Sequence, residues 1–202
     1  MKTLSKKLKT LSSDIDLKKS LGNIIILIAL ITLSYIYYPI ALVYSPYQAN
    51  IEVSDYSYSV SIPKINAVSP VMDDVNPFIE AQYQAALEKG VASGLGFADP
   101  GENSLIYLFA HSSGSPLRQS RYNTVFLRLG ELNNGDQINL KKDGKNYNYQ
   151  VSDKKEIWPS EVEKYLKSKN ENILVLQTCT PIGTSLKRLL IFAKPVSLPS
   201  QT

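Results

Sequence analysis

The stretch "ILVLQTCTPIGTSLKRLL", residues 173–190, decides the fold that we expect. An apolar run leads to Cys179, the only cysteine of the chain, and a loop with Pro181 and Gly183 follows before a second apolar run that contains Arg188. Two apolar runs separated by a Pro/Gly loop are typical of two buried strands. If these strands pair antiparallel, Arg188 lies opposite or diagonal to the region of Cys179, within reach of a long side chain.

The N-terminal part of the chain predicts a membrane anchor. Lysines cluster in the first 20 residues, and no charged residue stands between Lys19 and Glu52. The run "LGNIIILIALITLSYIYYPIALVY" (21–44) is long enough to cross a bilayer as a helix of roughly 20 residues. Lysines before it and tyrosines near its far end favour a cytoplasmic N-terminus. A cleavable signal peptide is the alternative, but the run is long for one and no convincing small-x-small site follows.

Both interpretations of the apolar run export the rest of the chain, so we expect a single-pass protein of the cell membrane with an extracellular domain. The expected segments are a basic cytoplasmic tail over 1–20, a transmembrane signal anchor over 21–44, a linker over 45–57, a folded domain over 58–196 and a tail over 197–202.

Composition narrows the possible partners and sites. The formal charge of +4 reflects the N-terminal lysines, and acidic residues are interspersed with the other basic ones, so we expect no nucleic-acid partner. One cysteine and one histidine allow neither an internal disulfide nor a zinc site of the Cys/His type. Asp73, Asp74 and Glu80 are candidates for a calcium cluster, but helix-start carboxylates and a solvated loop are the simpler interpretation. The prediction is no cofactor and no metal, with calcium as the alternative.

Residues 58–196 predict many short strands and two small helices, hence a mostly β barrel or sandwich. Strands are expected on both sides of Pro63, over Ser104–Ala110 with His111 at its end, and as a hairpin around Asp143-Gly144. One helix is predicted to have Asn76 as its N-cap, Pro77 at its first position and Gly90 at its end. The other is predicted from Ser160 and Glu163, which stand at capping-box spacing.

Cys179 and His111 each follow directly on a predicted strand, where a sheet presents side chains to an open face. With Arg188 they suit acyl transfer, in which a thiolate attacks a carbonyl, a histidine transfers protons and a cation stabilises the oxyanion. Each has a simpler interpretation: a small buried hydrophobe, a structural histidine and an arginine that extends to solvent. The other arginines, Arg118, Arg121 and Arg128, are alternatives for the third role.

Several motifs together resemble the sortases, membrane-anchored cysteine transpeptidases of bacterial surfaces. "VLQTC" (175–179) is similar to the TLxTC motif, and "CTPIGTSLKRLLI" (179–191) to the stretch from nucleophile to catalytic arginine. "LFAHSSG" (108–114) resembles the strand-plus-histidine motif, and "SIPKINAVSPV" (61–71) the opening strands. "TVFLRLGELNNGDQINL" (124–140) resembles a Phe-x-x-Leu segment and Gly-Asp turn. Val175 replaces a threonine and Ala110 a glycine, so the chain resembles a divergent subgroup with a single N-terminal anchor.

The resemblance implies an eight-stranded sortase β-barrel with Cys179 as nucleophile, His111 as general acid/base and Arg188 as oxyanion or substrate stabiliser. Thr178 and Ser112 are the candidates for substrate binding. The implied substrates are exported proteins with a C-terminal sorting motif of the Leu-Pro-x-Thr-Gly type. The implied acceptor is an amine of a cell-wall precursor or of a pilin subunit.

Two alternatives stay open at this point. An L,D-transpeptidase-like cysteine enzyme is also exported and β-rich, although its Ser-His-Gly-Cys type motif is missing from the chain. A non-catalytic, membrane-anchored β-domain that binds a surface partner is the other. Substrate specificity is expected in loops over 112–123 and 152–160.

Overall fold

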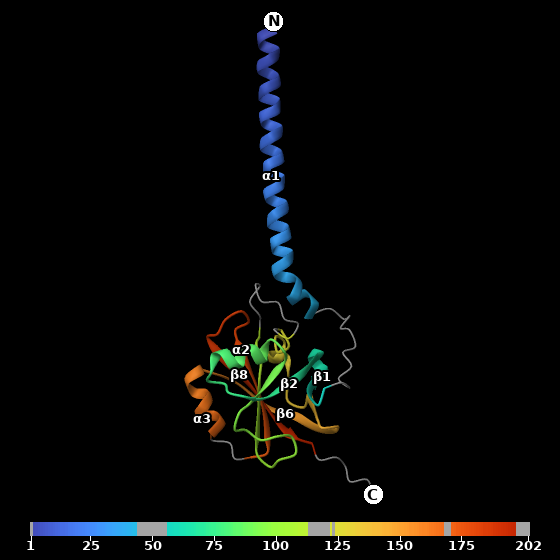
Figure 1. The fold of residues 1–202 in the computed structure, drawn as a ribbon, viewed down its shortest axis with the longest axis vertical. Helices are drawn as coiled ribbons and strands as arrows, with labels where there is room; N and C mark the ends of the chain where they lie inside the picture. Colours follow the sequence, from blue (N-terminus) through green and yellow to red (C-terminus); the bar gives the residue numbers. More distant parts are fainter. Residues whose placement is uncertain (1, 44–55, 113–121, 123, 168–170, 197–202) are drawn as a thin grey trace. The chain divides into compact units, whose positions relative to one another are not determined.

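The computed structural model describes residues 2–43, 56–112, 122, 124–167 and 171–196. It divides into two compact units, Met1–Ala41 and Leu42–Thr202. The first unit consists of the helix α1 (Lys2–Val43) up to Ala41, and the second holds all the described strands (Figure 1). Most of the predicted linker, the tail over 197–202 and most of the loop over 112–123 lie outside the described residues.

Helix α1 contains one segment, Lys19–Tyr38, that is long and apolar enough to cross a membrane. Its 20 residues have a mean hydropathy of 2.0, and its side chains are not buried against the protein. The hydroxyl of Thr32 donates to the carbonyl of Ile28 at 2.8 Å, so this polar group is satisfied within the helix. The segment overlaps the predicted anchor (21–44) from residue 21 to residue 38 and is consistent with membrane attachment.

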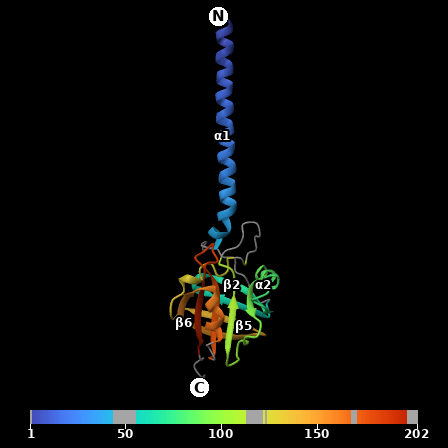
Figure 2. The same ribbon diagram turned by 90° about the vertical axis from the view of Figure 1, so that its left-hand side faces the viewer.

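The second unit is a closed β-barrel of eight strands within its described residues. The strand order around it is β1-β2-β3-β4-β7-β8-β6-β5, and two perpendicular views show its strands (Figure 1 and Figure 2). The strands are β1 (Tyr58–Ile62), β2 (Ala67–Val75), β3 (Val91–Gly94), β4 (Leu105–Phe109), β5 (Gln137–Lys142), β6 (Lys145–Ile157), β7 (Ile173–Thr180) and β8 (Lys187–Pro195). The predicted mostly β fold with an eight-stranded barrel is confirmed.

Among the described residues, two short helices and three 3₁₀ turns connect the strands. They are α2 (Glu80–Leu87), α3 (Val162–Lys167), η2 (Pro63–Ile65), η3 (Leu129–Glu131) and η4 (Pro159–Glu161). The predicted break at Pro63 is η2, with β1 and β2 antiparallel on its two sides. The Asp143-Gly144 hairpin joins β5 to β6, and both turn residues have positive φ (49° and 78°), as a type I′ turn requires.

Both helices begin at a different residue from the one predicted. Helix α2 starts at Glu80 because the side chain of Asn76 accepts the backbone N–H of Phe78 in a local turn and caps no helix. Before α3, the carboxylate of Glu161 accepts the backbone N–H of Trp158 at 2.8 Å. Glu163 instead pairs with Lys167 one turn on, so the predicted capping box was placed two residues too late.

The predicted specificity loop over 152–160 was also wrong, because β6 continues to Ile157 and η4 follows. The run of charged residues from Asp153 to Glu156 belongs to this strand, which pairs antiparallel with β8. One face of β6 therefore presents Lys154 and Glu156 together, two residues apart.

The core is deepest where β4 and β7 pair. Both strands read as nearly continuous apolar runs, as expected for parallel strands covered on both faces. The fully buried side chains include Ile106, Leu108, Leu174, Leu176 and Ile191. Phe126, Leu129 and Leu132, from the segment before β5, are also fully buried.

Gly90 is required by a close approach of two strands rather than by the end of a helix. A Cβ atom at this buried position would lie 2.3 Å from the backbone oxygen of Pro70 in β2. We therefore expect Gly90→Ala to lower the free energy of unfolding by about 1–3 kcal/mol, since backbone must move to admit the methyl group. Denaturant unfolding of the purified protein measures this.

The matched control is Gly130→Ala, because a Cβ there would meet only Leu189 Cδ2 at an ordinary 3.7 Å. Equal stability of the two variants would contradict the proposed clash at Gly90.

Candidate active site

Parallel pairing of β4 with β7 brings His111 and Cys179 to the same edge of the sheet. The register runs from Leu105↔Ile173 to Phe109↔Gln177, and the N–H of Ala110 continues it by donating to Gln177 O at 3.1 Å. His111 lies two residues beyond Phe109, and Cys179 two residues beyond Gln177. The two strands therefore deliver these side chains at the same level of the barrel.

Thr178 locks the two strand ends together. Its hydroxyl donates to the carbonyl of Ala110 at 3.0 Å, and the residue is 3% exposed. It sits directly before Cys179, and its acceptor directly before His111. The hydroxyl of Thr178 is thus buried and used inside the fold, and the contact of this residue with substrate stays a prediction. Ser112 is equally buried at 3%, which argues against its predicted contact with substrate.

Strand β8 places Arg188 beside the thiol, as the antiparallel pairing predicted. Cys179 and Arg188 are direct partners in the β7–β8 register. Direct partners share one face of an antiparallel pair, with Cβ atoms about 4.5–5.5 Å apart. The half-buried guanidinium donates to the carbonyls of Ser185 (3.0 Å) and Lys187 (3.3 Å), so the loop after β7 holds it.

The other arginines are less suited to the same role. Arg128 forms an ion pair with Glu131 at 2.7 Å, and further hydrogen bonds join the two side chains. Arg118 and Arg121 lie outside the described residues. Among the described arginines, only Arg188 stands opposite Cys179.

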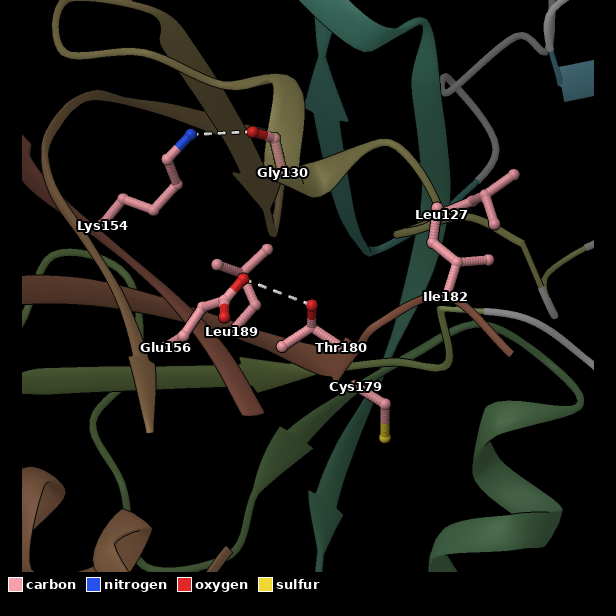
Figure 3. Close-up of a pocket in the computed structure, with 8 residues that line it drawn as sticks. All are labelled: Leu127, Gly130, Lys154, Glu156, Cys179, Thr180, Ile182 and Leu189. Atoms are coloured by element: carbon pink, nitrogen blue, oxygen red, sulfur yellow. Dashed lines mark hydrogen bonds between the residues drawn. The ribbon is translucent and has the colours of Figure 1, made fainter. Parts of the chain in front are cut away.

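Cys179 is a half-buried free thiol at the side of an open cavity of about 330 Å³. The cavity is lined by Leu127, Gly130, Lys154, Glu156, Cys179, Thr180, Ile182 and Leu189. Two of these residues form a hydrogen bond, in which the hydroxyl of Thr180 donates to the carboxylate of Glu156 at 3.4 Å. The sulfur of Cys179 points away from this pair (Figure 3). Neighbouring residues of a strand alternate in direction, so β7 separates the thiol from this pair.

Lys154 and Glu156 were missed from the sequence because their stretch was assigned to a loop. The ammonium of Lys154 donates to Gly130 O (2.7 Å) and Leu132 O (2.9 Å), which ties β6 to η3 (Figure 3). The signal that could have identified them is the two-residue spacing of Lys154 and Glu156, which places both side chains on one face of a strand.

His111 is half-buried, and desolvation by burial lowers its pKa below the ordinary 6.5. A histidine with a lowered pKa is neutral at pH 7, so it can accept a proton from the thiol. Under the site lies the buried Tyr107, whose pKa is raised by burial, although nearby Arg188 acts in the opposite direction. This tyrosine therefore stays protonated as part of the floor beneath the thiol and the guanidinium.

The two departures from the family pattern lie in the core. Val175 is fully buried and pairs with Tyr107, so an apolar side chain suits this position. Ala110 is 6% exposed, and its backbone makes both hydrogen bonds that join β4 to β7 at the site.

The candidate calcium ligands do not form a cluster in the described part of the chain. Asp73 is paired with Lys142 at 2.7 Å, and the same ammonium binds Asp99 at 2.6 Å. The described residues contain no group of three or more His, Cys, Asp or Glu arranged for a metal ion. The absence of a cofactor stays a prediction.

Comparison with known proteins gives a consistent result. The family model for the sortase domain matches residues 60–196. Sortase D of Bacillus subtilis is 30% identical over 149 residues, which is 72% of this chain and 67% of that protein.

Solved structures agree with the sequence matches. A lid mutant of sortase A from Corynebacterium diphtheriae is 28% identical, with a TM-score of 0.58 and 71% of each chain covered. Sortase C-1 from Actinomyces oris is 26% identical, with the same TM-score, and the match covers 70% of this chain and 73% of that one.

Replacing Thr178 tests the link between the strand ends. Thr178→Val keeps the shape but removes the hydroxyl donor from the buried carbonyl of Ala110, so we expect the free energy of unfolding to fall by about 1 kcal/mol. Thr180→Val is the matched control on the same strand, because its hydroxyl is partly exposed and makes only the 3.4 Å contact. Denaturant unfolding should show the larger loss for Thr178→Val, and the reverse order would refute the link.

The single histidine makes its titration unambiguous. We expect an NMR titration of His111 in the folded protein to give a midpoint below 6.5, because burial disfavours the imidazolium. Between the lowered pKa and 6.5 the unfolded chain binds a proton that the folded protein does not, so the free energy of unfolding falls as pH drops through this range. A midpoint above 6.5 would mean that a negative partner, such as a thiolate, outweighs burial.

Proposed function

This chain belongs to the sortase family, and we propose that it is an active cysteine transpeptidase with Cys179 as nucleophile, His111 as general acid/base and Arg188 as oxyanion stabiliser. The observation that carries the proposal is the convergence of three strands. Arg188 is the register partner of Cys179, and His111 lies two residues beyond the end of β4, the strand on the other side of β7. Half-burial of all three residues limits water while leaving room for a substrate.

The first half-reaction forms a thioester. His111 takes the thiol proton, and the sulfur of Cys179 attacks the carbonyl carbon of the scissile peptide bond. Arg188 donates hydrogen bonds to the oxyanion that develops, since it is charged at any working pH. His111 then gives the proton to the leaving amine, the C–N bond breaks, and the acyl group stays on sulfur.

The second half-reaction transfers the acyl group to an amine. The acceptor nitrogen attacks the thioester carbonyl, its proton passes to His111, and the C–S bond breaks to restore the thiol. We propose exported proteins with a C-terminal Leu-Pro-x-Thr-Gly-like motif as substrates. The proposed acceptor is an amine of the cell envelope or of a pilin subunit. One solved neighbour is a sortase C1 of a pilus island, which supports the second choice without deciding it.

Helix α1 is the proposed membrane anchor, with residues 1–20 in the cytoplasm and the barrel outside the cell. The apolar segment Lys19–Tyr38 and the lysines before it support this orientation. The non-catalytic alternative predicts the same anchor and barrel but a thiol that forms no acyl adduct.

Mass spectrometry of the full-length protein in detergent tests the proposal with a library of Leu-Pro-x-Thr-x peptides. We expect a thioester adduct on Cys179 and none in Cys179→Ala. His111→Ala and Arg188→Ala should each slow adduct formation by at least about 100-fold, because each removes a group used in the transition state.

Arg128→Ala is the matched control for the arginine, since Arg128 is paired with Glu131. If Arg128→Ala lost the adduct while Arg188→Ala formed it at the full rate, Arg128 and not Arg188 would be the oxyanion stabiliser. A folded protein that forms no adduct with any peptide would favour the non-catalytic domain.

A further inference from the structure

Three exposed apolar side chains gather where β6 and β7 end and β8 begins. Trp158 follows β6, while Ile182 and Leu186 lie in the loop between β7 and β8. Their exposed fractions are 51%, 54% and 56%. The three strands are neighbours in the barrel, and Ile157 and Cys179 are both register partners of Arg188. We call Trp158, Ile182, Leu186 and the adjacent Lys187 the rim cluster.

The rim cluster is held in place by hydrogen bonds rather than folded onto the core. The backbone N–H of Trp158 is bound by Glu161, and the ammonium of Lys187 lies 5.5 Å from the centre of the Trp158 ring. In the loop, Thr184 bonds twice to Pro181 O, at 3.0 Å through its N–H and at 2.8 Å through its hydroxyl. A loop fixed in this way keeps Ile182 and Leu186 in water, which is unfavourable unless something covers them.

We propose that the rim cluster docks on the surface of the lipid bilayer. Tryptophan and lysine are the residues that favour the headgroup level, and aliphatic side chains enter the acyl boundary below it. Lysine also adds electrostatic attraction to anionic lipids.

The covalent tether favours a lipid surface over a partner from solution. Residues 39–57 join the apolar segment of α1 to β1, and even a fully extended chain of this length reaches at most about 70 Å. An anchored barrel therefore stays close to the bilayer, and at such an effective concentration a small apolar cluster suffices for docking. This step rests on the proposed membrane anchor but not on catalysis.

Docking would fix where the chemistry takes place. The loop that carries Ile182 and Leu186 runs from Cys179 to Arg188, and Ile182 lines the cavity beside Cys179 (Figure 3). Docking of this loop would therefore hold Cys179 and Arg188, the residues at its two ends, close to the headgroups.

The only tryptophan of the chain, Trp158, reports on the docking directly. The full-length protein is reconstituted in vesicles of phosphatidylglycerol and phosphatidylethanolamine, with and without bromine on the acyl chains near the headgroup. We expect brominated lipid to reduce Trp158 fluorescence roughly twofold, because a docked indole lies at the headgroup level. Leu186→Ser with Lys187→Glu should remove most of this quenching.

The matched control is Phe78→Ser, which removes another exposed aromatic side chain at a position outside the rim cluster and should leave quenching unchanged. Thermal unfolding of each variant verifies that the barrel is intact. Flotation of the vesicles tests the proposed membrane anchor separately from the docking of the rim cluster. Protein that floats with the vesicles while Trp158 is not quenched would refute docking and leave the anchor standing. Protein that does not float would overturn both.

A different occupant would give a different result. If Trp158 is not quenched by brominated lipid, but its emission shifts when a Leu-Pro-x-Thr-Gly peptide is added, the rim cluster belongs to a peptide site and the membrane proposal is wrong.

Discussion

The parallel pairing of β4 with β7 is the constraint on which the rest of the site depends. Parallel strands end at the same edge, so a histidine and a cysteine that are 68 positions apart in sequence arrive side by side. The hydroxyl of Thr178 and the backbone of Ala110 fix the last step of the pairing directly before both residues. A shift of one residue would turn one of the two side chains to the opposite face of the sheet.

Strand β8 then completes the site by a local route. The turn after Cys179 is short, so antiparallel pairing returns Arg188 to the position opposite the thiol. The guanidinium donates to the carbonyl of Ser185 in the loop and to that of Lys187 at the start of β8, which orient it. One long-range and one local pairing thus bring together a thiol, an imidazole and a guanidinium. Separately, the Lys19–Tyr38 segment of helix α1 is long and apolar enough to cross a membrane.

The sequence predicted the barrel and the position of Arg188 because alternation, apolar runs and the Asp143-Gly144 turn are local signals. It did not reveal the role of Thr178, because only the fold shows that its hydroxyl meets a carbonyl on another strand. The helix starts were missed for local reasons: Asn76 binds the N–H of Phe78 in a turn that competes with a helix cap. The capping box that does form uses Glu161, two residues before the predicted Glu163. The charged residues at the end of β6 were assigned to a loop, because only the fold shows that this stretch pairs with β8.

The central claim is that His111 and Arg188 act on one transition state at Cys179. A double-mutant cycle tests it most directly, with the rate of thioester formation measured for His111→Ala, Arg188→Ala and the double variant. Residues that act as a unit are strongly non-additive, so the account predicts that the double variant is about as slow as the slower single variant. Two losses that simply multiply would show independent roles and would contradict a shared site.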